Sequence, residues 1–282
     1  MRASAALRAG FFTGFYLAGR GLERAAKLAY HTAAGTMRLV DLHRAIALEW
    51  EDAGARESER YVSSFGLTYW EQELYPRFLR RDDRILVVGC GTGRDLVALL
   101  QRGYRAAGLD LSSGCTATAR DVLAKRGLEA DVVTGDIATA KLPGSFDAFV
   151  FSAFCYSLIP HSDARVAVLR RVKEHLTPGG RILISYIPCD PLPSRIPIRL
   201  TQGIARLSGS DWRPEYGDIL FLASRGKRFD HFEHRFPPGE FEREARAAGL
   251  SLLFHDPGEA TAVLVAGESS GGVTAPGPAA AP

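Results

Sequence analysis

Three glycines at alternate positions are the first residues in this chain whose spacing points to chemistry. They follow four apolar residues at 85–88, which predict a buried strand, and apolar residues with helical spacing begin at Leu96. Glycine lets a ligand approach the backbone closely, and a helix N-terminus offers free N–H groups. The segment therefore predicts a nucleotide-type binding site formed by Gly89, Cys90, Gly91, Thr92 and Gly93.

The spacing of these glycines excludes two other phosphate-binding motifs. A dinucleotide motif, G-x-G-x-x-G, would need a glycine at Arg94 or, counted from Gly91, at Leu96. A Walker phosphate loop would need Gly-Lys-Ser/Thr, which this turn lacks. A glycine turn that serves packing alone remains an alternative. Cys90 stands where a small residue is needed, and its thiol is given no chemical role.

Two acidic residues follow at the ends of further predicted strands. Asp110 ends the segment 104–110, 21 residues after Gly89, and a carboxylate at that distance can accept hydrogen bonds from both hydroxyls of a ribose. An NAD enzyme would use an acid in the same way, so Asp110 supports a ribose without naming the cofactor. Asp136 ends a third short strand at 131–137.

Five segments in this order resemble the class I S-adenosylmethionine-dependent methyltransferases. They are the glycine turn, the two acidic strand ends, a fourth strand at 146–151 and an L-x-P-G-G turn into a fifth strand at 176–185. The resemblance extends from Asp83 to Gly267. It implies S-adenosyl-L-methionine as cofactor, with Asp110 on the ribose, Asp136 on the adenine amino group and the next backbone N–H on a ring nitrogen. The expected cofactor-binding residues beyond the glycine turn are Asp110, Leu111, Asp136, Ile137, Phe151, Ser152 and Tyr69.

One position departs from the family pattern. The family usually carries an acid two residues before the first motif glycine, and here that residue is Val87. We therefore expect other groups, such as backbone carbonyls near Phe151 and Ser152, to hold the methionine amine.

The expected fold is a doubly wound α/β domain with a mostly parallel seven-stranded sheet and an antiparallel last strand. Strands alternate with helices predicted at 94–102, 113–125 and 163–176, and the last two strands are predicted at 250–254 and 261–265. We expect a helical N-terminal extension over 1–80, a methyltransferase domain over 81–267 with an insertion at 188–228 acting as a substrate lid, and a disordered tail at 268–282.

Composition limits the class of protein. With 282 residues, 46% hydrophobic and 24% charged, the chain is an ordinary globular protein, and a net charge of +3 gives no argument for a nucleic-acid partner. The four cysteines are scattered without a C-x-x-C pair, which fits a reducing cytoplasm and predicts no metal site. Residues 1–30 combine an apolar run with basic residues. They predict an amphipathic helix that packs on the protein or a partner, or lies on a membrane surface.

Candidate catalytic residues lie beyond the fourth strand. Tyr156 and His161 could act as a base, although His161 also reads as a loop residue beside a helix N-cap. Ser152-Ala153-Phe154-Cys155 lacks the motif of base amino-methylation and the acid of metal-assisted catechol methylation. We expect in-line methyl transfer to oxygen or nitrogen of a small molecule. A lipid-like or protein substrate near a membrane, a non-catalytic S-adenosylmethionine-binding partner protein and a NAD-dependent reductase remain alternatives.

Overall fold

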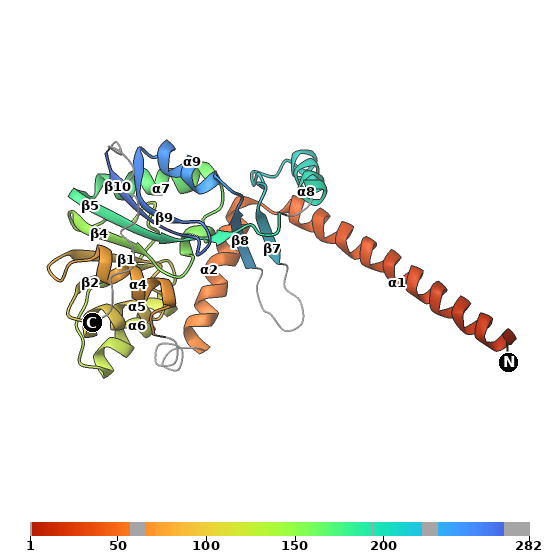
Figure 1. The fold of residues 1–282 in the computed structure, drawn as a ribbon, viewed down its shortest axis with the longest axis horizontal. Coiled ribbons are helices and arrows are strands. Elements are labelled where there is room, and N and C mark those ends of the chain that lie inside the picture. Colours follow the sequence, from red (N-terminus) through yellow and green to blue (C-terminus); the bar gives the residue numbers. More distant parts are fainter. Residues whose placement is uncertain (1, 57–65, 193–194, 222–230, 268–282) are drawn as a thin grey trace, which may run out of the picture. The chain divides into compact units, whose positions relative to one another are not determined.

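Seven strands form one twisted sheet in the order β3-β2-β1-β4-β5-β10-β9 (Figure 1). Neighbouring strands run parallel except at β10, which is antiparallel to both β5 and β9. This confirms the doubly wound sheet and its antiparallel last strand. The strands are β1 (Arg84–Val88), β2 (Arg105–Asp110), β3 (Val132–Thr134), β4 (Phe146–Phe151), β5 (Leu176–Ser185), β9 (Leu250–Asp256) and β10 (Thr261–Ala266).

The computed structural model describes residues 2–56, 66–192, 195–221 and 231–267. The predicted tail at 268–282 lies outside them. The three helices predicted at 94–102, 113–125 and 163–176 are present, with ends that agree to within two residues. The helices of the sheet region are α2 (Leu39–Arg56), α4 (Tyr69–Phe78), α5 (Arg94–Gln101), α6 (Ser113–Lys125), η1 (Cys155–Leu158), α7 (Ser162–Glu174) and α9 (Glu240–Ala247).

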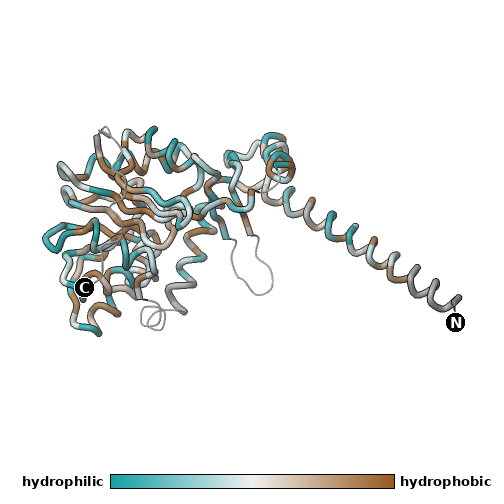
Figure 2. Tube along the Cα trace, in the orientation of Figure 1, coloured by the Kyte–Doolittle hydropathy of each residue, from teal (hydrophilic) through white to brown (hydrophobic). Residues whose placement is uncertain are grey.

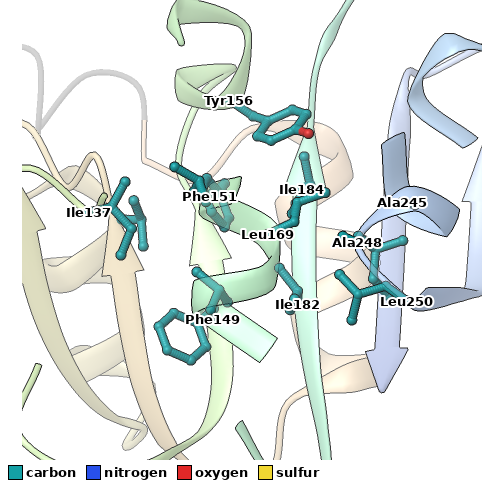
Figure 3. Close-up of a cluster of buried hydrophobic side chains, with 14 of the residues drawn as sticks. Ile137, Phe149, Phe151, Tyr156, Leu169, Ile182, Ile184, Ala245, Ala248 and Leu250 are labelled. Carbon is teal, nitrogen blue, oxygen red and sulfur yellow. The ribbon is translucent and has the colours of Figure 1, made fainter. Parts of the chain in front are cut away.

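The core consists of two apolar clusters whose members alternate along the strands. In β1, Leu86 and Val88 belong to one cluster, whereas Ile85 and Val87 belong to the other. Successive side chains of a strand point to opposite faces, so the alternation places one cluster on each face of the sheet. Figure 3 shows part of the first cluster, where Phe149, Phe151, Ile182 and Ile184 of β4 and β5 meet α7 and α9. Both faces of the sheet are therefore covered, as a parallel sheet requires.

A smaller sheet follows in the order β6-β8-β7, with β6 (Ile187–Pro188), β7 (Asp218–Phe221) and β8 (His231–Phe236). His234 of β8 is fully buried, and its Nδ1 lies 2.7 Å from Oδ1 of Asp218 in β7. In the same strand, Nδ1 of His231 lies 2.7 Å from Oε2 of Glu49 in α2. These contacts show that the two histidines of β8 are held by acidic partners inside the fold.

The chain divides into two compact units, one formed by 1–42 and 194–216 and the other by 43–193 and 217–282. This division differs from the predicted one, because residues 43–80 group with the methyltransferase region and the insertion is split between the units. We call residues 1–42 and 194–216 the helical unit. It contains α1 (Arg2–Thr36) and α8 (Arg195–Ser208).

The helices of the helical unit approach each other closely. His31 Nδ1 lies 2.9 Å from Thr201 Oγ1, and Ser208 Oγ donates to the carbonyl of Gly35 at 3.0 Å. A side chain at Gly35 would meet Ile204 Cβ at 2.7 Å, so this contact requires glycine. Along α1 hydrophobic and hydrophilic residues alternate (Figure 2). None of the described helices is long and apolar enough to cross a membrane.

Candidate functional site

The glycine turn directly follows β1 and leads into α5. All three glycines have positive φ angles, of 68°, 53° and 95° for Gly89, Gly91 and Gly93. A side chain at Gly89 would meet Cys155 Cβ at 2.7 Å, whereas one at Gly91 would meet nothing within 4 Å. The first glycine is therefore required by packing. Gly91 faces open space into which a ligand can fit.

Asp110 at the end of β2 holds this turn in place. Its Oδ2 accepts a hydrogen bond from the backbone N–H of Gly91 at 2.8 Å, and its Oδ1 accepts one from Ser112 at 2.9 Å. Burial raises the pKa of Asp110 and outweighs the lowering by these two N–H groups. A carboxylate has about four lone-pair positions, so each oxygen retains capacity for a further donor.

A cavity of about 350 Å³ opens over the turn and the C-terminal ends of β1, β2 and β4. In a doubly wound sheet, ligands bind at this edge where the strand order reverses, and here β1 stands between β2 and β4. The volume lies in the range of small-molecule and cofactor sites, about 300–1,000 Å³. The cavity is lined by Ile46, Ala47, Trp50, Val88, Gly89, Cys90, Gly91, Thr92, Arg94, Leu109, Asp110, Leu111, Ser112, Cys115, Gly135, Asp136, Ile137, Phe151, Ser152, Ala153, Cys155, Leu158 and Ile159.

Most of the predicted cofactor residues line this cavity. They are Gly89, Cys90, Gly91, Thr92, Asp110, Leu111, Asp136, Ile137, Phe151 and Ser152. Gly93 does not, because it is the N-cap of α5 and packs against Ala119 of α6. Tyr69 is also outside the lining, since it begins α4 with a side chain that is 75% exposed. Tyr69 thus has no place in the cavity as the structure describes it.

The two candidate catalytic residues lie outside the cavity lining. Tyr156 is fully buried beside Phe151 in the core (Figure 3), and its hydroxyl donates to Glu244 at 2.8 Å. Burial, reinforced by Glu244, raises the pKa of Tyr156 well above its usual value. A buried phenol that donates to a carboxylate is a structural group, so we withdraw the catalytic role for Tyr156. His161 precedes α7 with a φ of 69°, which places it at a helix start.

Cys90 and Cys155 beside the cavity form no disulfide bond and hold their protons. Burial raises the pKa values of Cys90 and Cys155 well above the usual value, and nearby Asp110 adds to the effect. A thiolate is the nucleophilic form of cysteine, so these thiols are not suited to attack a substrate. The sequence-based interpretation of Cys90 as a small packing residue agrees with this environment.

One wall of the cavity comes from α2, which the sequence analysis did not assign to the site. Ile46 and Ala47 line the cavity together with Trp50, which lies about one turn further along this helix. Glu51, the next residue, accepts hydrogen bonds from the N–H groups of Ser113 and Gly114 at the start of α6, at 2.7 and 2.9 Å. The apolar spacing of α2 was visible in the sequence, but only the fold shows which partner it faces.

A buried ionic network includes Arg94 and Asp95, the two residues that follow the glycine turn. Arg94, which lines the cavity, donates to both carboxylate oxygens of Glu71 at 2.7 and 2.5 Å, and its Nη2 lies 2.6 Å from Asp95 Oδ1. Tyr75 donates to the other oxygen of Asp95 at 3.4 Å. Burial and then the nearby Glu71 raise the pKa of Asp95. These acids stand close to the turn that, in the family pattern, is held by an acid at the position of Val87.

The strand order, the open glycine turn and the acid at the end of β2 together define a class I methyltransferase fold. Comparisons with known proteins agree. Residues 85–180 match the family model described as "Methyltransferase domain". An S-adenosylmethionine-dependent methyltransferase from Clostridium acetobutylicum ATCC 824 has the same fold, with a TM-score of 0.53, 15% identity and coverage of 72% of this chain and 93% of that one.

Two relatives are similar in sequence. A cypemycin N-terminal methyltransferase from Streptomyces sp is 32% identical over 148 residues, which cover 50% of this chain and 56% of that protein. A ubiquinone biosynthesis O-methyltransferase from Stutzerimonas stutzeri (strain A1501) is 29% identical over 171 residues, which cover 60% of this chain and 65% of that protein. The chain thus spans less than two thirds of each of these relatives. Residues 85–180 carry a methyltransferase domain, and the sheet has the fold of class I methyltransferases.

Proposed function

We propose that this protein transfers a methyl group from S-adenosylmethionine to an oxygen or nitrogen of a small-molecule acceptor. The observation that carries the proposal is the open space over Gly91, next to the carboxylate of Asp110, which accepts two backbone hydrogen bonds. A glycine with no neighbour leaves room for a ligand, and the adjacent carboxylate can still accept hydrogen bonds from hydroxyl groups.

Each end of the cofactor has a proposed partner in the cavity. Asp110 would accept from the ribose hydroxyls, and Asp136 from the adenine amino group, while the N–H of Ile137 meets a ring nitrogen. Asp136 has one oxygen, Oδ1, engaged by the N–H of Ala138 at 2.8 Å, so its second oxygen is available. The carbonyls near Phe151 and Ser152 would hold the methionine amine.

The chemistry needs positioning more than a resident base. When bound, the sulfonium of S-adenosylmethionine supplies a methyl group that is already activated for displacement. The lining residues contain no histidine, tyrosine or lysine in the part of the chain that the structure describes. Holding the acceptor in line and excluding water can contribute about 7–11 kcal/mol of the barrier. We therefore propose that the protein acts by orientation, on an acceptor that is nucleophilic without help from Tyr156.

The acceptor is proposed only as far as its reacting atom. One relative is named for an N-terminal methylation and the other for an O-methylation, so both an amine and a hydroxyl compound are acceptors to test. The alternatives of a lipid-like or protein acceptor and of a non-catalytic cofactor-binding partner make different predictions in the same assay.

The proposal is tested in two steps on the full chain. Calorimetric titration with S-adenosylhomocysteine, with NADH as control, should give binding of the first ligand only. Labelled S-adenosylmethionine is then offered with a panel of phenols, small amines, lipids and peptides with free N-termini. Binding of NADH, or of neither ligand, would refute the cofactor assignment. Cofactor binding without turnover over the whole panel would instead support the non-catalytic alternative.

A further inference from the structure

An apolar stripe runs along the exposed part of α1. The described side chains between Phe11 and Ala29 are all exposed. Phe11, Phe15 and Leu22 are 61%, 74% and 73% exposed. Their spacing of four and seven residues places them on one face of the helix. Large apolar side chains gathered on one exposed face mark a surface that binds something apolar.

Basic residues follow a second stripe of the same helix. Arg20 and Arg24 are exposed and lie one turn apart. Arg20 is five residues beyond Phe15, which corresponds to an angle of about 140° around the helix axis. Over its length α1 has five basic residues and one acidic residue. The helix therefore exposes Phe11, Phe15 and Leu22 on one side and the charges of Arg20 and Arg24 on another, which also carries the exposed Leu17 and Leu28. Exposed apolar and basic side chains on one helix are typical of helices that lie in a membrane interface.

The second helix of the helical unit repeats this combination. Leu200 and Leu207 of α8 are 38% and 90% exposed, and Arg199 and Arg206 are exposed beside them. The segment Arg195–Ser208 contains three arginines and no acidic residue. Two helices joined in one unit thus expose both apolar and positively charged side chains.

We propose that the helical unit docks on the surface of an anionic lipid bilayer. The positive charge of both helices indicates an anionic partner. An anionic surface attracts clustered arginines, and the hydrocarbon boundary accepts the phenylalanines. A second copy of the chain would bring two positively charged surfaces together, which opposes association. The proposal does not depend on the identity of the methyl acceptor.

Cosedimentation of the full chain with lipid vesicles tests this proposal. We expect binding to vesicles containing phosphatidylglycerol at low ionic strength, and partitioning roughly tenfold weaker into vesicles of phosphatidylcholine alone. Added salt should release the protein, because exposed charges are screened. The substitutions F11S/F15S and R20E/R24E should each weaken binding to the anionic vesicles by roughly tenfold.

Matched controls come from the other unit. V133S/L253S removes two apolar side chains that are 44% and 42% exposed, and K141E reverses an exposed charge. These variants should bind vesicles like the unchanged protein. Circular dichroism and S-adenosylhomocysteine affinity should be unchanged in all variants, which separates loss of docking from loss of folding.

Three outcomes would overturn the proposal. One is the absence of binding to anionic vesicles at low salt, and another is equal binding by the α1 variants and the unchanged protein. The third is a dimer, detected by light scattering, that F11S/F15S dissociates while vesicle binding is absent. That result would assign the stripe to a second copy of the chain.

Discussion

Replacing Asp110 by asparagine tests whether one side chain both builds the glycine turn and binds the cofactor. In the structure both partners of Asp110 are N–H donors, of Gly91 on one oxygen and of Ser112 on the other. Asparagine keeps only one oxygen, so its NH₂ group must face one of these donors. One hydrogen bond to a charged acceptor is lost, at about 1.5–3 kcal/mol, and a backbone donor is left without a partner.

We therefore expect D110N to lower the free energy of unfolding by about 2 kcal/mol. Affinity for S-adenosylhomocysteine should fall by roughly 10- to 100-fold, since the turn is displaced and the ribose loses its charged acceptor. Urea denaturation measures the first quantity and calorimetric titration the second. D110A should be affected in the same direction.

Asp136 provides the matched control. Its Oδ1 accepts from the N–H of Ala138, and the carbonyl of asparagine can keep that bond. D136N should therefore lower affinity for S-adenosylhomocysteine while changing the free energy of unfolding by less than about 0.5 kcal/mol. If D110N unfolds at the same urea concentration as the unchanged protein and binds equally well, the reasoning about Asp110 is refuted.

Three further predictions concern other parts of the fold. G91V should abolish binding of S-adenosylhomocysteine by filling the open space, whereas G127V, at a similar φ of 64° and outside the cavity, should leave it intact; equal titration curves would contradict this. Y156F should lower the free energy of unfolding by about 1–3 kcal/mol without changing cofactor affinity, and a large loss of affinity would restore Tyr156 to the site. Hydrogen bonds to Glu233 and Glu49 raise the pKa of His231 to about 9. Because this pKa is above the unfolded value, the stabilisation is complete below about pH 6.5 and is lost as the pH rises through about 9. The unchanged protein should thus exceed H231Q in free energy of unfolding by about 1–2 kcal/mol near pH 6 and by little at pH 10; a constant difference would be incompatible with this linkage.

The sequence alone determined the sheet and the glycine turn, because these depend on local patterns. Apolar runs, alternate glycines and acids at strand ends each act over a few residues, and their order along the chain restricts the topology of parallel strands. The position of Asp110 after a predicted strand indicates a ribose acceptor, whereas the role expected of Asp136 comes from the resemblance to the family. Both line the cavity in the structure.

Contacts between residues that are distant in the sequence were decided only by the tertiary structure. Nothing local shows that Trp50 lines the cavity over a turn at Gly91, or that Glu51 caps a helix starting at Ser113. The same applies to Tyr156, which shares the loop after β4 with cavity-lining residues but turns toward Glu244, 88 residues away. A polar side chain in a loop has both a solvent-exposed and a buried alternative, and the choice depends on a partner that only the packed chain brings near. Local periodicity therefore determined the elements and the glycine turn, whereas the walls of the cavity and the orientation of its neighbours required long-range packing.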